Sequence, residues 1–151
     1  MKKINRGMNL PDQDHVIRHV SSSKLLRDGD GKILGFLPQA FALRPTEVSL
    51  SVNWLAFFDG DHSTRTEKTI QELRTSQVIR KKSAFGIGNV GNIKEVCKTN
   101  RAVVKIVYSP RGHIPSHSEI RDLPRDHSLL LQALATDAFC EIVRNADIAE
   151  K

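Results

Sequence analysis

Titratable side chains stand close together at His113, His117 and Glu119, within the segment SPRGHIPSHSEI. This segment directly follows an apolar, β-branched run, AVVKIVY, that ends in Tyr108. Functional sites are commonly built where strands end in polar loops. If the segment is extended, alternation places His117 and Glu119 on one face, which suits an acid–base or ribose-binding pair. We therefore expect a site here, although no motif in the segment fixes a reaction.

The same cluster has two alternative interpretations. His113 and His117 have the spacing of two ligands on one helical face, but Pro115 lies between them and disfavours a helix. A zinc ion would need a third protein ligand, for which Asp122 and His127 are the candidates. The second alternative is an ordinary solvated loop. If the cluster is a site, we expect one without a metal.

Two earlier segments carry polar side chains inside strand-like patterns. HVIRHV, residues 15–20, is short and β-branched, so we expect a strand in which Arg18 shares a face with two valines. Such an arginine either extends to the surface or points into a site. VSLSVN then alternates apolar residues with Ser49 and Ser51, which predicts a second strand with a small polar face. That face is either solvent-exposed or lines a ligand cleft.

Three glycines, Gly86, Gly88 and Gly91, match the GxGxxG spelling of a dinucleotide-binding turn. That fingerprint also needs a longer helix behind it and an acidic residue about 20 positions on. The chain has Arg111 at that distance. We therefore expect these glycines to allow close packing or a bulge in a strand.

Length and composition indicate one folded domain. The chain has 151 residues, of which 39% are hydrophobic and 26% charged, an ordinary balance for a globular protein. Residues 1–13 are polar and basic, and we expect a flexible N-terminal arm before a single domain over 14–151. No apolar run approaches the ~18 residues of a membrane helix, so we expect a cytoplasmic protein. Cys97 and Cys140 have apolar neighbours, and we expect two buried thiols in predicted helices.

The net charge of +6 favours an anionic partner, such as a nucleotide, a nucleic acid or an acidic protein. Its densest cluster follows a predicted helix. These cations are either a solvated helix end, where they complement the helix dipole, or a patch that contacts phosphates. The second interpretation predicts an accessory subunit that binds nucleic acid or a larger protein complex. The cluster consists of Arg74, Arg80, Lys81 and Lys82.

The order of predicted elements indicates an α+β fold. We expect a single compact domain with a small mixed sheet, flanking helices and a C-terminal helix. The predicted strands are 15–20, 48–53, 102–108 and 118–123, and the predicted helices are 64–80, 93–98 and 127–144.

Read together, the segments HVIRHVSSSKLL, LSVNWL and PSHSEI resemble a family of small uncharacterised prokaryotic proteins over most of residues 15–125. They also resemble, more loosely, ADP-ribosyltransferase-like domains of the toxin type. That resemblance implies that Arg18 holds NAD and that Ser49 or Ser51 supports the nicotinamide ribose. It further implies that Glu119 stabilises the oxocarbenium-like state as nicotinamide leaves.

Two hypotheses follow. The first is a protein with an NAD-type nucleotide cleft, in which Glu119 and His117 are catalytic and Arg18, Ser49 and Ser51 bind the ligand. The second is a non-enzymatic accessory subunit that uses the basic cluster.

Overall fold

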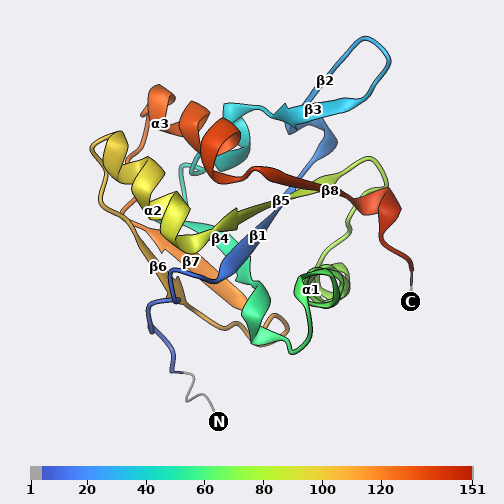
Figure 1. The fold of residues 1–151 in the computed structure, drawn as a ribbon, viewed down its shortest axis with the longest axis horizontal. Coiled ribbons are helices and arrows are strands. Elements are labelled where there is room, and N and C mark those ends of the chain that lie inside the picture. The colour runs from blue at the N-terminus through green and yellow to red at the C-terminus, as the bar shows by residue number, and fades with distance from the viewer. Residues whose placement is uncertain (1–4, 151) are drawn as a thin grey trace.

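A continuous antiparallel sheet sets which face each side chain of this domain occupies (Figure 1). The computed structural model describes residues 5–150. Within them, six strands pair in the order β6-β7-β4-β1-β5-β8, and every pairing is antiparallel. The strands are β1 (His15–Val20), β4 (Ser49–Trp54), β5 (Ala84–Asn89), β6 (Lys105–Tyr108), β7 (His117–Arg121) and β8 (Glu141–Arg144).

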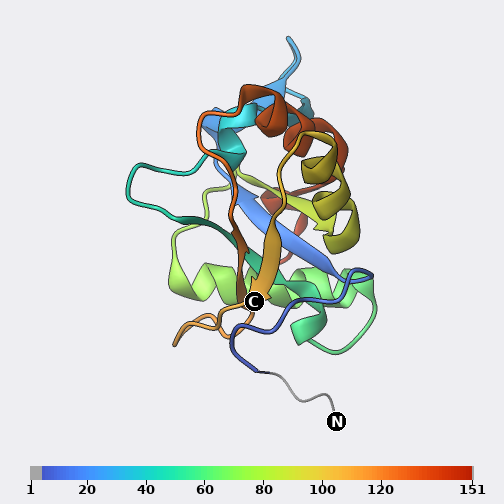
Figure 2. The ribbon, with the colours of Figure 1, turned by 90° about the vertical axis from the view of Figure 1, so that its left-hand side faces the viewer.

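Helices cover both faces of the sheet, α1 (His62–Ser76) on one and α2 (Val90–Thr99) with α3 (Ser128–Ala133) on the other (Figures 1 and 2). A π-helical turn, Leu134–Ala138, continues α3. Each face buries its own apolar cluster. The larger lies on the α2–α3 side, and the smaller packs Ile17 and Phe85 against Ile70 of α1. None of the described helices combines the length and apolar character needed to cross a membrane.

A separate hairpin of β2 (Leu25–Arg27) and β3 (Ile33–Phe36) projects from the body of the domain (Figure 1). The Asp28 carboxylate accepts hydrogen bonds from two main-chain amides of the connecting turn. Aspartate commonly closes turns in this way. Short 3₁₀ segments, which complete the described elements, lie at Ser22–Lys24, Pro38–Phe41, Leu55–Phe57 and Asn145–Asp147.

The predicted α+β class is confirmed, but two details of the prediction are wrong. The main sheet is antiparallel rather than mixed. The helix expected over 127–144 ends at Ala138, and β8 follows it. β8 pairs with β5, so that Ile142 lies opposite Gly86. Pairing with an open sheet edge thus outweighs the helical spacing of the apolar residues there.

The predicted arm and the predicted buried thiols are each only partly matched. Gly7 and Leu10 donate main-chain hydrogen bonds to β6, and Leu10 belongs to the core, so this part of the arm packs on the domain. Residues 1–4 lie outside the described residues. Cys97 is buried as expected, and burial raises its pKa to about 11. Cys140 is exposed, because it lies after the π-helical turn and not inside a helix.

The glycines of β5 are where neighbouring elements approach the sheet closely. A Cβ on Gly86 would lie 2.9 Å from the ring of Phe36. A Cβ on Gly88 would lie 2.8 Å from the carbonyl oxygen of Ala138, in the π-helical turn. The two glycines therefore serve packing, as the sequence analysis favoured, and β5 runs into α2 without a phosphate-binding loop.

Replacing Gly88 with alanine should destabilise the fold by roughly 1–3 kcal/mol, because a main-chain oxygen cannot move aside as a side chain can. Urea unfolding followed by circular dichroism measures this. Gly112→Ala is the matched control, because nothing lies within 4 Å of the Cβ it would add. Equal unfolding midpoints for the two variants would refute the packing role of Gly88.

Candidate functional site

Strand pairing brings four of the predicted site residues onto one face of the sheet. Ser51 lies opposite Glu119, and Asn53 lies opposite His117, in the β4–β7 ladder. Directly paired residues share a face, and so do residues two positions apart. Ser49 therefore joins them. This is the face that α1 covers over β1 and β5, but the site lies beside that helix, on β4 and β7.

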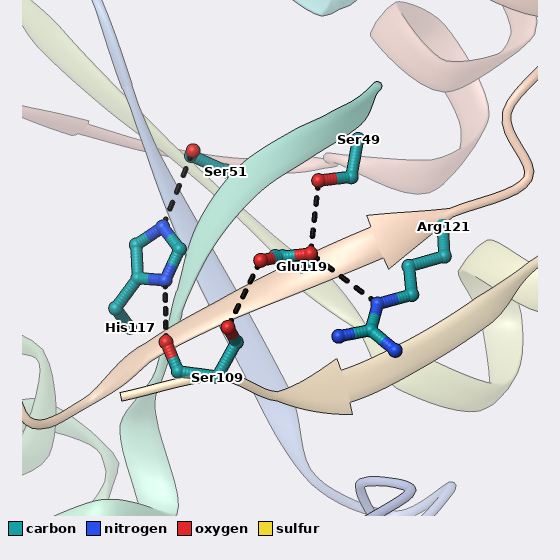
Figure 3. Close-up of polar contacts among 6 residues, drawn as sticks. All are labelled: Ser49, Ser51, Ser109, His117, Glu119 and Arg121. Carbon is teal, nitrogen blue, oxygen red and sulfur yellow. Dashed lines mark hydrogen bonds and ion pairs between the residues drawn. The ribbon is translucent and has the colours of Figure 1, made fainter. Parts of the chain in front are cut away.

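The carboxylate of Glu119 is the centre of this arrangement (Figure 3). Ser109 Oγ donates to its Oε1 at 2.9 Å, and Ser49 Oγ donates to its Oε2 at 2.9 Å. Arg121 Nε reaches Oε2 at 3.3 Å, and the Glu119 side chain is 16% exposed. Burial alone would raise the pKa of Glu119, but the hydrogen bonds from these three side chains outweigh it and lower the pKa. The carboxylate is thus held ionised.

His117 lies beside it with both ring nitrogens engaged (Figure 3). Nδ1 is 2.7 Å from the carbonyl oxygen of Ser109, which can only accept, so Nδ1 carries a proton. In the neutral ring, Nε2 then accepts from the hydroxyl of Ser51 at 3.2 Å. The residue is 3% exposed, and burial lowers its pKa. A serine, a neutral histidine and an orienting carbonyl form a relay that can take up a proton.

Sequence reasoning missed Ser109 and Arg121. Ser109 uses its main chain to orient His117 and its side chain to hold Glu119. The only signal was its position directly after the strand that ends in Tyr108. We name the six residues of Figure 3 the Glu119 face: Ser49, Ser51, Ser109, His117, Glu119 and Arg121.

A second set of hydrogen bonds anchors the loop that leads into β7. The amide and hydroxyl of Ser116 both donate to Oε1 of Glu72 in α1, at 3.1 and 2.8 Å. Asn53 Nδ2 donates to the Ser116 hydroxyl at 3.0 Å. The position of His117 is thereby fixed from the helix as well as from the sheet.

Arg18 does not join the Glu119 face, which corrects the prediction that it binds the same ligand. Ile17 pairs with Asn53, so the neighbouring Arg18 side chain emerges on the opposite face. Its Nε donates to the carbonyl oxygen of Ala40 at 2.7 Å, and its Nη1 donates to that of Ser51 at 2.8 Å. Burial lowers its pKa to about 10, so the guanidinium stays charged at neutral pH. Arg18 therefore joins main-chain segments where the β1–β4 ladder ends.

Arg74, one of the four residues of the predicted basic cluster, is engaged within the protein. The guanidinium of Arg74 donates to the carbonyl oxygens of Asn145, Ile148 and Ala149, and so holds the C-terminal segment against α1. It is not free to contact phosphates as the nucleic-acid hypothesis required. The other three predicted residues, Arg80, Lys81 and Lys82, are exposed in the turn before β5.

Two further features bear on the site. Among residues 5–150, no three histidine, cysteine or carboxylate side chains gather as metal ligands would. A hollow of about 1440 Å³ lies along α1, lined by Phe58, Glu72 and Pro115 among others, and a second of about 470 Å³ lies near β8. Neither includes Glu119 or Ser51. The Glu119 face is therefore separate from both hollows, and most of its side chains are buried or half-buried.

Comparison with known proteins finds no matching family model, no matching curated protein and no matching solved structure. The fold and site define an α+β domain with a six-stranded antiparallel sheet and a polar, carboxylate-centred patch on one face. Its function has to be argued from that patch.

The buried histidines predict acid sensitivity. Burial lowers the pKa of both His117 and His19 from 6.5, so below about pH 6.5 the unfolded chain binds more protons than the folded one. The free energy of unfolding should therefore be flat just above pH 6.5 and fall below it, by up to about 1.4 kcal/mol per pH unit for each histidine. Glu119 affects stability only at lower pH. The pKa of its carboxyl is lowered from the ordinary value of 4.5, so its contribution to stability is lost only as the pH falls below about 4.5.

Urea unfolding at a series of pH values between neutral and mildly acidic measures this dependence. His117→Gln should make the fall in stability shallower, with the contribution of His19 remaining, whereas substitution of the exposed His113 should leave it unchanged. A stability that stays constant as the pH drops through 6 would contradict the buried, neutral state of these rings.

Proposed function

We propose that the Glu119 face binds the ribose of an NAD-type nucleotide, and that the protein is an ADP-ribosyltransferase-like enzyme that cleaves the bond to nicotinamide. The observation that carries this proposal is the ionised Glu119 carboxylate, 16% exposed and held by two serine hydroxyls. A fixed anion of this kind favours positive charge that develops beside it.

The hydroxyl protons of the face are already committed, which limits the ligand. Ser49 and Ser109 donate to Glu119, and Ser51 donates to His117. Each serine oxygen keeps lone pairs, and a carboxylate can accept about four hydrogen bonds. Apart from Arg121, the face therefore offers hydrogen-bond acceptors to a ligand. The matching ligand offers donors and positive charge, which describes a ribose diol joined to a cationic pyridinium ring.

The reaction that fits this surface is dissociation at the anomeric carbon. The bond between C1′ and the nicotinamide nitrogen breaks, and its electron pair neutralises the pyridinium nitrogen. Positive charge passes to the ribose as an oxocarbenium ion, which the Glu119 carboxylate stabilises. Water then forms the new C1′–O bond and gives its proton, through Ser51, to Nε2 of His117. The products are nicotinamide, ADP-ribose and one proton.

The phosphates of such a ligand need a cation other than Arg18, which lies on the opposite face. Arg121 belongs to the Glu119 face, and its side chain is 46% exposed. Only its Nε is engaged with Glu119, so its terminal nitrogens can reach a phosphate. Because the cation that would contact the phosphates is an exposed arginine, whose charge salt screens, we expect weak binding with a large dependence on salt.

Incubating the purified protein with NAD and measuring nicotinamide by chromatography tests the reaction. We expect release above the uncatalysed background and a thermal shift with ADP-ribose. Boiled protein is the first control, and Glu95→Gln, an exposed carboxylate on α2, is the matched variant that should retain full release. Absence of both release and thermal shift in the wild-type protein would end the proposal.

A further inference from the structure

The hollow of about 470 Å³ near β8 has an unusual charge. Four of its nine lining residues are cationic and none carries a carboxylate. They come from three segments far apart in the sequence: the β2–β3 hairpin, the turn before β5, and the end of β8. We call it the basic hollow; it is lined by Ser22, Arg27, Gly31, Ile33, Lys81, Lys82, Ser83, Arg144 and Ala146.

Hydrogen bonds between these segments fix the shape of the basic hollow. Arg27 Nη1 donates to the carbonyl oxygen of Gly31 at 2.9 Å, within the hairpin. Its Nη2 donates to the carbonyl oxygen of Lys82 at 2.9 Å and to the Ser22 hydroxyl at 3.3 Å. The hairpin and the turn are therefore held together by one guanidinium.

Three of the other polar side chains in the lining are available to a ligand. Lys81 and Lys82 are exposed, and no side-chain hydrogen bond or ion pair engages their ammonium groups within residues 5–150. Ser83 is 2% exposed, and within the same residues its hydroxyl makes no hydrogen bond. Arg144 is held in place by a two-point contact with Asp147. Cations at the rim and an unused hydroxyl at the wall are what an anion requires.

We propose that the basic hollow binds a small phosphate-bearing molecule, a phosphomonoester or a polyphosphate. Two or more positive charges from different directions favour a doubly charged group over a single carboxylate. The volume lies within the range of small-molecule sites. The half-buried Asp28 and the exposed Asp30 and Asp147 stand next to the lining in sequence. An extended phosphodiester chain would pass these carboxylates, so a compact ligand is favoured over nucleic acid.

This site is separate from the Glu119 face. Ile87 of β5 lies on the same face as Glu119, because it pairs with Ile17, which in turn pairs with Asn53. Ala84 is three positions from Ile87 and so lies on the other face, and Arg144, which pairs with Ala84, lies there too. Four strand spacings separate β7 from β8, which is about 19 Å at ~4.8 Å each. The two sites can therefore be tested independently.

Titration with pyrophosphate, followed by calorimetry at low and moderate salt, tests the basic hollow. We expect the double variant K81Q/K82Q to weaken pyrophosphate binding by at least tenfold, and Ser83→Ala to weaken it by a smaller factor. Both lysines are exposed, so the double variant should fold normally; Lys98→Gln on α2 is the matched control and should leave binding unchanged.

Three results would overturn the assignment. They are no binding of pyrophosphate by the wild-type protein, equal binding by K81Q/K82Q, and an oligonucleotide that binds more tightly than pyrophosphate and is weakened by the same variant. Glu119→Gln should leave pyrophosphate binding unchanged, which keeps this test separate from that of NAD cleavage.

Discussion

Glu119→Gln should reduce nicotinamide release from NAD by about 100-fold or more. Glutamine keeps the shape of the side chain. Its one oxygen can accept from one of the two serines, Ser49 or Ser109, and its amide NH2 can donate to the other, but it removes the negative charge. Loss of one preorganised group that stabilises transition-state charge typically lowers turnover by 10²–10³. Initial rates of nicotinamide formation at saturating NAD measure the effect.

The fold should survive this change, since both serines keep a partner. A thermal midpoint close to that of the wild-type protein, together with unchanged release by Glu95→Gln, completes the experiment. If Glu119→Gln releases nicotinamide at the wild-type rate, the carboxylate is structural and the proposed reaction is wrong.

Arg18→Ala should lower the free energy of unfolding by about 2–3 kcal/mol. The guanidinium satisfies the carbonyl oxygens of Ala40 and Ser51, and alanine leaves both without that partner. An unsatisfied buried polar group costs about 1–3 kcal/mol, and hydrogen bonds from charged groups are at the upper end. Chemical denaturation measures the change.

The variant also separates a structural role from a ligand-binding role. Arg18→Met, which fills the space without donors, should fall between alanine and the wild-type protein in stability. Arg111→Ala is the control, because that arginine is exposed. The folded fraction of Arg18→Met should still release nicotinamide. Loss of binding with full stability would instead place Arg18 in the site, as the resemblance to ADP-ribosyltransferases implied.

Local patterns predicted four of the six strands of the sheet, β1, β4, β6 and β7, because alternation and β-branched residues reflect short-range chemistry. The strand over 15–20 is β1, and the small polar face of Ser49 and Ser51 is real. Alternation also placed Arg18 with its two valines. What it could not supply was the pairing of distant strands, which decides that Ser51 lies opposite Glu119 and that Arg18 faces away from both.

The C-terminal region shows why spacing alone misleads. Leu134 and Ala138 do lie on a buried helical surface, but the helical turn widens there and the chain leaves it at Phe139. The Phe139 ring stacks on Phe41, with centroids 4.7 Å apart. The next residues then pair with the exposed edge of β5. These contacts involve residues about 55 and 100 positions away, and no local window contains them.

The hydrogen-bond partners of individual side chains could not be predicted from the sequence either. Arg74 belongs to a basic run in the sequence, yet its guanidinium is taken up by the carbonyl oxygens of the C-terminal segment. Arg27 was not singled out, and it ties the hairpin to the turn that carries Lys82. Charge counting thus found Lys81 and Lys82 of the basic hollow. The other two predicted residues, Arg74 and Arg80, do not line it, whereas Arg27 and Arg144 do.

The most direct test of the Glu119 face uses nicotinamide riboside, which carries the ribose and the cationic ring but no phosphate. Titrating it into ¹⁵N-labelled protein, we expect the shifted amides to be those of residues 49–51, 109 and 117–121. The amides of 27–33, 81–83 and 144 should stay in place. Shifts confined to the second set, or none at all, would contradict the assignment of the ribose site to Glu119.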